Sequence, residues 1–232
     1  MPLVSIVLPI FNEDCLYLEQ CLQSIRGQSL QEWECIIILE STNDENKLII
    51  EKICNDDRRF RIELPAIRLG LPASLNLGVK LASSDLIARI DSDDRMKNDR
   101  LQEQVKFLEA NKNVSVVGSF YNKIDAESLD KGVRRYPLRG LSLLIYFVFR
   151  CGLAHPTVMF RKRDFTAVGG YNESLSYCED LDLWLRYIQR GLKLENMNKV
   201  LIDYRISKRS HKHWSQMLKV RLRHLMWLLK VK

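Results

Sequence analysis

Short apolar runs and stretches with helical periodicity alternate along the first half of the chain. Runs rich in Val, Ile and Leu, each bounded by polar residues, predict buried strands at 4–9, 33–39, 60–64 and 86–90. Between them, apolar residues recur every three or four positions, which predicts helices at 15–28, 48–56 and 73–82. This alternation favours an α/β fold with a mainly parallel sheet and helices on both faces.

The second half is less regular. Residues 114–118 predict another strand, and residues 155–160 lead into a strand with a proline near its start, where a missing donor is tolerated. The strongly apolar segment 141–149 is too short to span a bilayer, and we expect it to be buried under the sheet rather than to contact a membrane. Apolar residues with helical spacing predict a helix at 181–190.

Length and composition narrow the class of protein. A chain of 232 residues suits one large α/β domain or two small ones. We find no transmembrane run and no secretion signal, and the six cysteines lack the Cys-x-x-Cys spacing of zinc sites. Scattered free cysteines suit a reducing compartment, so we expect a cytoplasmic protein.

Positive charge is concentrated at the C-terminus. Residues 205–232 hold nine Lys and Arg and no acid, so 27 of the 36 basic residues remain elsewhere against 29 acidic ones. Leucines at helical spacing in this segment predict a basic amphipathic helix, which favours binding to an anionic membrane rather than to nucleic acid. The alternative is a terminal helix that packs on the protein and leaves its charges in solvent. We place the domain boundary between 1–205 and a tail, 206–232.

Three acids follow the fourth predicted strand. Asp91, Asp93 and Asp94 repel one another, and a divalent cation with oxygen ligands is the usual way to offset such charge. The alternative is that these acids cap the helix predicted at 97–111. Polar residues also follow the first strand, at Asn12 and Glu13, and the second strand. In parallel sheets ligands bind beyond the carboxyl ends of the strands, which favours a binding crevice at this edge.

Taken in order, the motifs resemble glycosyltransferase family 2, the inverting nucleotide-sugar transferases with the GT-A (Rossmann-like) fold. The resemblance runs from residue 4 to about residue 205. It rests on Ser5-Ile6-Val7-Leu8-Pro9-Ile10-Phe11-Asn12-Glu13, Gly70-Leu71 with Leu75-Asn76-Leu77-Gly78, Asp91-Ser92-Asp93-Asp94, Gly169-Gly170-Tyr171-Asn172-Glu173, Glu179-Asp180-Leu181-Asp182-Leu183-Trp184 and Tyr204-Arg205.

The resemblance implies a role for each matching residue. Asp93 would bind Mn²⁺ or Mg²⁺, with Asp91 near the metal or the ribose. Asp180 would be the general base that takes a proton from the acceptor hydroxyl, and Glu179 would help to position donor or acceptor. The remaining substrate-binding residues implied are Pro9, Phe11, Asn12, Glu13, Asn76, Ser92, His155 and Arg205.

Two positions depart from the family pattern. The Asp that usually contacts the nucleobase is most simply Glu40 here, one methylene longer, which leaves the choice of base open. Arg68 stands where Asn is common; a bidentate contact with a diphosphate and a solvated surface position are equally compatible with the sequence. The Gln-x-x-Arg-Trp motif of processive polymerases is absent, so a single addition is implied.

The resemblance therefore implies metal-dependent transfer of one sugar, most simply from a UDP-sugar, to a glycan or a polyprenyl-diphosphate-linked sugar. Such enzymes build O-antigen or capsule at the inner face of the cell membrane. Two alternatives are a catalytically silent nucleotide- or lipid-binding module and a sugar-phosphate nucleotidyltransferase. The second would need a Gly-rich loop with Arg after the first strand, and the chain has Pro9-Ile10-Phe11-Asn12 there.

Overall fold

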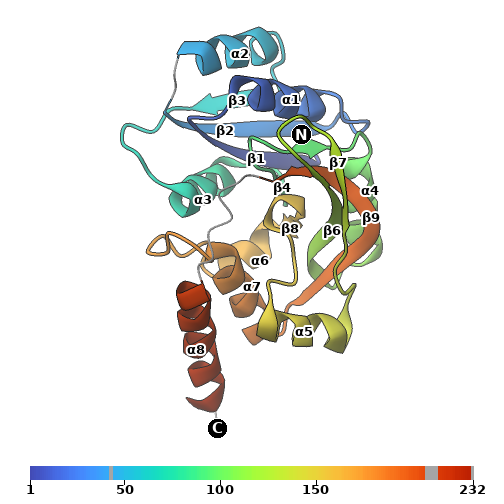
Figure 1. Ribbon diagram of the computed structural model, residues 1–232, viewed down its shortest axis with the longest axis vertical. Coiled ribbons are helices and arrows are strands. Elements are labelled where there is room, and N and C mark those ends of the chain that lie inside the picture. The colour runs from blue at the N-terminus through green and yellow to red at the C-terminus, as the bar shows by residue number, and fades with distance from the viewer. Residues whose placement is uncertain (42–43, 207–213, 231–232) are drawn as a thin grey trace.

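The computed structural model describes residues 1–41, 44–206 and 214–230 (Figure 1). The first half comprises β1 (Val4–Phe11), α1 (Cys15–Arg26), β2 (Trp33–Ser41), α2 (Asp44–Cys54), β3 (Phe60–Glu63), α3 (Leu71–Leu81), β4 (Leu86–Arg89), β5 (Arg95–Met96) and α4 (Arg100–Ala110). The second half comprises β6 (Val114–Ile124), β7 (Asp130–Arg134), α5 (Gly140–Phe149), η1 (His155–Thr157), β8 (Met159–Arg161), α6 (Lys162–Ala167), α7 (Glu179–Gln189), β9 (Lys193–Arg205) and α8 (Trp214–Lys230).

One nine-stranded sheet organises the molecule, in the order β3-β2-β1-β4-β8-β6-β9-β5 with β7 paired to β6. The neighbours from β3 to β4 are parallel, as the alternating pattern predicts. Beyond β4 the sheet is mixed, because β8 is antiparallel to both β4 and β6 while β6 and β9 are parallel. The predicted α/β class is confirmed, and the second half adds antiparallel strands to the parallel first half.

Helices cover both faces of the sheet, and each face has its own core. Leu18 of α1, Ile50 of α2 and Leu101 of α4 pack on one face. Leu75 of α3 and Trp184 of α7 pack on the other. Successive residues of a strand point to opposite faces, and burial of both faces explains the unbroken apolar runs of the central strands.

The acids after β4 do not cap a helix, so that alternative is wrong. The strand β5 stands between Asp94 and α4, which begins at Arg100 and has Asp99 at its N-cap. The register explains this: Arg95 and Met96 pair with Asp203 and Ile202 of β9, which draws the chain along the sheet edge before the helix can start.

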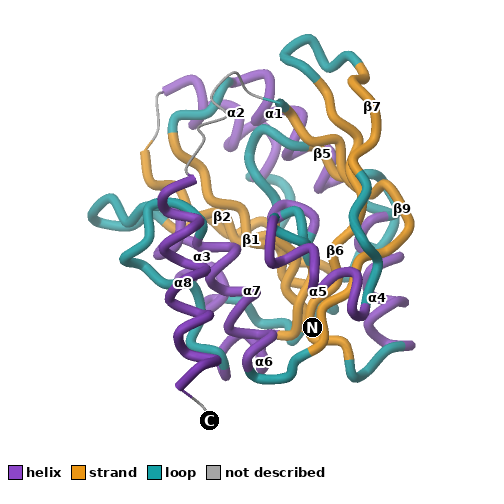
Figure 2. Tube along the Cα trace, turned by 60° about the horizontal axis from the view of Figure 1, so that its bottom comes forward, coloured by secondary structure: helices purple, strands orange, loops and turns teal. Residues whose placement is uncertain are grey.

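The segment 141–149 forms the helix α5, and the expectation that it is buried under the sheet is wrong. Two of its side chains, Leu143 and Phe147, are buried, whereas Leu141, Val148 and Phe149 are 72%, 61% and 68% exposed. Figure 1 shows α5 at the lower edge of the molecule, far from α2, and in the turned view of Figure 2 it lies near the middle, between α7 and α4. This short helix is apolar on all sides, so it carries more apolar side chains than its packing against the protein requires.

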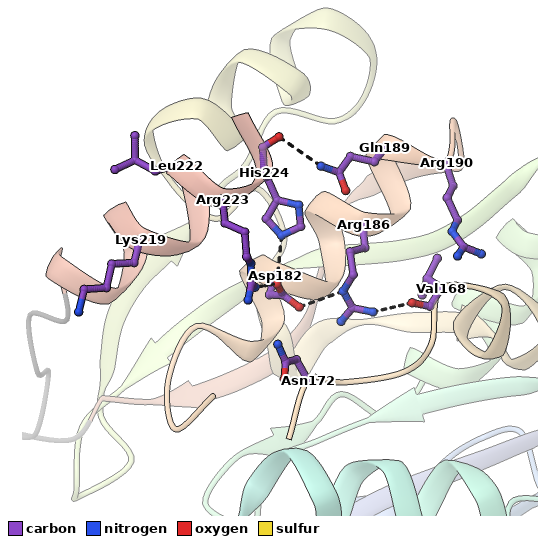
Figure 3. Close-up of a pocket in the computed structure, with 10 residues that line it drawn as sticks. All are labelled: Val168, Asn172, Asp182, Arg186, Gln189, Arg190, Lys219, Leu222, Arg223 and His224. Atoms are coloured by element: carbon purple, nitrogen blue, oxygen red, sulfur yellow. Dashed lines mark hydrogen bonds and ion pairs between the residues drawn. The ribbon is translucent and has the colours of Figure 1, made fainter. Parts of the chain in front are cut away.

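The tail helix α8 packs against α7 rather than standing free. Val220 and His224 are buried, and Asp182 of α7 accepts hydrogen bonds from His224 Nε2 at 3.0 Å and from Arg223. Arg186 Nε donates to the same carboxylate at 2.9 Å (Figure 3). For residues 214–230 the structure therefore contains the alternative expectation, a terminal helix that packs on the protein. The rest of the predicted tail, 207–213 and 231–232, lies outside the described residues. In the described ranges no helix is long and apolar enough to cross a bilayer.

Candidate active site

The acidic loop at the carboxyl end of β4 is built on a buried arginine. Arg89 is 2% exposed, and its guanidinium donates to both carboxylate oxygens of Asp91, with Nη1 2.6 Å from Oδ2. Residues i and i+2 of an extended segment point the same way, so the end of β4 places this cation beneath Asp91. A charge-assisted bidentate pair of this kind fixes the orientation of the carboxylate.

Asp91, Asp93 and Asp94 form a cluster in which one carboxylate oxygen of each lies within 4.8 Å of the others. Burial, together with the negative charges of Asp91 and Glu13, raises the pKa of Asp93 to about 7. Burial raises the pKa of Asp94 well above its usual range, and Asp94 Oδ2 is buried with no hydrogen-bond partner among the described residues. This oxygen-only donor set, with excess negative charge and an unsatisfied oxygen, fits Mg²⁺ or Mn²⁺.

The carboxyl ends of β1 and β2 and the turn before α3 join the acidic loop around a cavity of about 240 Å³. Its lining includes Pro9, Phe11, Glu40, Arg68, Asp91 and Ser92, six of the residues predicted to bind substrate. The Arg68 guanidinium lies over the Phe11 ring at 4.0 Å from the ring centroid. Glu13 Oε2 accepts a 2.7 Å hydrogen bond from Ser92 Oγ, and this bond links the first loop to the acidic one.

Glu40 holds the turn before α3. Its carboxylate accepts hydrogen bonds from the backbone N–H groups of Leu69 at 3.1 Å and Gly70 at 2.8 Å, and from Ser74 Oγ. The extra methylene relative to Asp lets the carboxylate reach the N-terminus of α3, where a negative charge is favourable. Glu40 therefore shapes the cavity wall, and its contact with a nucleobase stays a prediction.

A second pair of acids begins α7, immediately after Cys178, which has a left-handed backbone with φ of 62°. Asp180 Oδ2 accepts a 3.4 Å hydrogen bond from the thiol of Cys151, and its Oδ1 accepts one from the backbone of Leu181 at 2.7 Å. Glu179 is 8% exposed, with Oε1 3.6 Å from Nδ1 of His155. The fold thus places residues 151, 155, 179 and 180 together, although their positions in the sequence are far apart.

The pKa values of the side chains in this group differ from those of the same side chains in water. Burial raises the pKa of Asp180, and burial together with the neighbouring Asp180 charge raises the pKa of Glu179 to about 7. Burial and the positive charge of Arg89 lower the pKa of His155 well below its usual range, so its imidazole is neutral. His155 Nε2 lies 2.8 Å from the hydroxyl of Tyr171, which orients the ring.

Arg89 connects the two acidic groups and was not among the residues predicted from the sequence. Its positive charge acts on the pKa values of Asp93 and Asp94 on one side and of Glu179 and Asp180 on the other. Asp91 in turn contributes to the raised pKa of Glu179, so the two groups are electrostatically coupled. An arginine inside an apolar strand, two residues before an acid, was the signal that could have found it.

Two other predicted residues hold the scaffold around the site. The Asn76 amide bonds the backbone N–H and C=O of Tyr171 at 2.8 and 3.0 Å, which fastens α3 to the loop before α7. Arg205 is buried; its backbone N–H donates to Asp94 Oδ1 at 2.8 Å and its Nε donates to the carbonyl of Asp93 at 3.0 Å. Its other donors bond the 125–128 turn and Gln20, so its substrate contact stays a prediction.

The amino-acid sequence is similar to those of known glycosyltransferases. Residues 5–168 match the family model for glycosyl transferase family 2. A UDP-Gal:alpha-D-GlcNAc-diphosphoundecaprenol beta-1,3-galactosyltransferase of Escherichia coli is 32% identical over 219 residues, which cover 91% of this chain and 77% of that protein. The amylovoran biosynthesis glycosyltransferase AmsE of Erwinia amylovora is 28% identical over 203 residues, covering 87% of this chain and 75% of that protein.

The fold has solved counterparts. Residues 1–349 of S. aureus TarS in complex with UDP-GlcNAc superpose with a TM-score of 0.76 at 16% identity, over 97% of this chain and 67% of that chain. The longer TarS structure superposes with a TM-score of 0.74 at 16% identity, and 95% of this chain spans 39% of it. The likeness to TarS confirms the GT-A fold, and the family match shows that the chain is a glycosyltransferase that belongs to glycosyl transferase family 2.

Proposed function

We propose that the protein transfers a single sugar, with inversion and metal dependence, from a nucleotide-sugar donor to a hydroxyl of a glycan or lipid-linked sugar. The observation that carries this proposal is the pairing of two acidic groups through one buried cation. Arg89 bonds Asp91 of the 91–94 cluster, which suits a cation and a diphosphate, and its charge acts on the pKa values of the 179–180 pair, which suits proton transfer.

In the proposed reaction Asp180 accepts the proton of the acceptor hydroxyl as that oxygen attacks the anomeric carbon. The new C–O bond forms on the face opposite the bond to the diphosphate oxygen, which breaks and releases the nucleoside diphosphate. Glu179 and the neutral His155 would orient the sugar. The residues around the 240 Å³ cavity, with Arg68 and Phe11 at its wall, would receive the nucleotide.

Asp91 and Asp93 would hold Mn²⁺ or Mg²⁺, with Asp94 behind them. When bound, the cation neutralises the diphosphate and so makes it a better leaving group. Arg89 offsets part of the carboxylate charge through its bidentate contact with Asp91.

The acceptor class rests on the relatives. One acts on a sugar carried by diphosphoundecaprenol, by its name, and another acts in amylovoran biosynthesis. We propose a lipid-linked sugar as the acceptor and UDP as the nucleotide of the donor, in the synthesis of a cell-surface polysaccharide such as O-antigen or capsule.

A panel of UDP- and GDP-sugars, incubated with a lipid-linked monosaccharide and with Mn²⁺, Mg²⁺ or chelator, tests this function. We expect chelator-sensitive transfer from one donor of the panel, with inversion of the anomeric configuration in the product. Nucleotide binding without turnover of any donor would favour the silent binding module instead. Release of diphosphate from a nucleoside triphosphate and a sugar phosphate would favour the nucleotidyltransferase.

The raised pKa values of the α7 acids predict the pH dependence of transfer. A general base acts only when it is deprotonated. Burial raises the pKa of Asp180, the proposed base, above its usual value, and Glu179 beside it gains a proton as the pH falls through about 7. We therefore expect kcat/KM to be highest above pH 7 and to fall at a higher pH than an ordinary carboxylate base would give. Initial rates between pH 5 and 9 measure this; a profile that stays flat down to pH 5 contradicts it.

We also propose that the protein binds an anionic membrane surface peripherally, at the cytoplasmic face. The support is the eight basic residues of the tail, 206–232, and the exposed apolar side chains of α5. We expect the full chain to sediment with vesicles containing anionic lipid at low salt and to be released by about 0.5 M salt, because screening weakens such attraction. Equal sedimentation with zwitterionic vesicles would contradict an electrostatic contact.

A further inference from the structure

The helices α5, α7 and α8 enclose a second cavity, about 500 Å³ in volume, outside the acidic site. Most of its lining is aliphatic or aromatic: Leu144, Phe147, Val148, Leu185, Ile188, Leu218 and Leu222. We call this cavity the α5–α8 groove. Its volume lies within the roughly 300–1,000 Å³ of small-molecule sites. Leu144, Val148, Leu218 and Leu222 are 45%, 61%, 57% and 47% exposed, so the groove opens to the surface.

One cationic side chain lines this apolar groove. Arg221 of α8 has Nε and Nη2 buried, and within the described part of the chain neither atom has a hydrogen-bond partner. A guanidinium with unsatisfied, desolvated donors is costly unless it has an anionic ligand. Phosphate oxygens match its geometry, because the planar donors can bind two oxygens at once.

The helices that line the groove are linked to the proposed general base: α7 itself begins with Glu179 and Asp180. The helix α5 leads directly to Cys151, whose thiol donates to Asp180. Arg221 lies close enough to Cys178, the residue before Glu179, for its charge to counter the raised pKa of that thiol. The same helix, α7, therefore lines the groove with Leu185 and Ile188 and carries the two acids at its first turn.

From this arrangement we propose that the α5–α8 groove binds the lipid part of the acceptor. The first prenyl units lie between α5 and α8, and Arg221 contacts the phosphate that joins lipid to sugar, so that the sugar hydroxyl is presented to Asp180. The proposal rests on the proposed function, because it assigns a prenyl-diphosphate-linked sugar as acceptor. It also gives a reason for the exposed apolar face of α5, which packing of the domain does not require.

A binding experiment tests the groove without requiring turnover. The full chain is titrated, without divalent cation, with farnesyl diphosphate, with inorganic diphosphate and with farnesol. We expect the prenyl diphosphate to bind at least about tenfold more tightly than either half alone. Arg221→Met should weaken its binding roughly 10- to 100-fold and leave farnesol binding unchanged. Lys219→Met removes the same charge from an exposed position on α8 and should leave all three affinities unchanged.

A second variant tests the apolar wall. Val148→Glu places a charge at an exposed position of the groove, where it should weaken binding of the prenyl diphosphate without unfolding the protein. Equal losses from Lys219→Met and Arg221→Met would overturn the proposal, since the basic tail alone would then explain binding. Loss of binding in Asp93→Asn but not in Arg221→Met would also overturn it, because the probe would then lie in the donor site. Absence of sugar transfer with these affinities intact would instead count against the proposed function.

Discussion

Asp180→Asn should reduce sugar transfer roughly 100- to 10,000-fold while leaving the affinity for the nucleotide nearly unchanged. The amide has the shape of the carboxylate, and its oxygen can still accept the hydrogen bond of Leu181 N, while its NH2 group takes the place of the oxygen that accepts from Cys151 Sγ. It cannot accept the proton of the acceptor hydroxyl. The loss should therefore fall on kcat, with the KM for the donor unaffected.

Initial rates and calorimetry on the same preparations separate these effects. Asp85→Asn, at an exposed carboxylate before β4 and thus at the opposite edge of the sheet, is the matched control and should keep full activity. If Asp180→Asn lost nucleotide binding as completely as transfer, the residue would have a role in donor binding, and the assignment of a base would be wrong.

The second large effect is expected at the cation site. Asp93→Asn should weaken Mn²⁺-supported binding of the nucleotide by at least roughly 10- to 100-fold, the range found when even a supporting partner of a metal ligand is lost. The amide removes a negative charge and one anionic ligand from the 91–94 cluster, while Asp91 remains held by Arg89. In the presence of chelator, nucleotide binding should be weak in both the unsubstituted protein and Asp93→Asn, and the two affinities should differ little.

Titration of the protein with nucleotide, with and without Mn²⁺, measures how much the cation strengthens nucleotide binding. Asp99→Asn is a suitable control because Asp99 lies nearby in sequence, at the N-cap of α4, and its side chain makes no capping hydrogen bond. Unchanged affinity of Asp93→Asn in the presence of Mn²⁺ would show that Asp93 is not a metal ligand. The Asp93 and Asp180 variants should thus separate donor binding from proton transfer.

The predicted strands at 4–9, 33–39 and 86–90 are all present, because a central parallel strand is buried on both faces and its sequence is apolar throughout. The strands β5, β7 and β9 were missed. They are two to thirteen residues long and mix charged and apolar residues, so their own pattern does not define them. These strands are defined instead by their pairing in the sheet: β7 and β9 pair with β6, and β5 pairs with β9.

The same division applies to the acidic site. The motif Asp91-Ser92-Asp93 and the pair Glu179-Asp180 could be recognised from the order of fragments along the chain. The relation between these two groups could not be recognised, because it depends on Arg89, whose charge acts on both, and on His155 and Tyr171, which come from separate elements. A side chain's pKa depends on neighbours that the fold supplies, so the value of about 7 for Glu179 could not be foreseen from the residue type.

By itself, then, the sequence determined the α/β class, the family and the identity of the acidic residues, because periodicity and ordered motifs are local properties. The tertiary structure decided three other features: the coupling of the two acidic groups through Arg89, the packing of α8 on α7 and the exposure of α5. Each depends on which surfaces meet when distant segments pack. An apolar helix such as α5 has the same sequence pattern whether a sheet covers it or a groove is left open beside it.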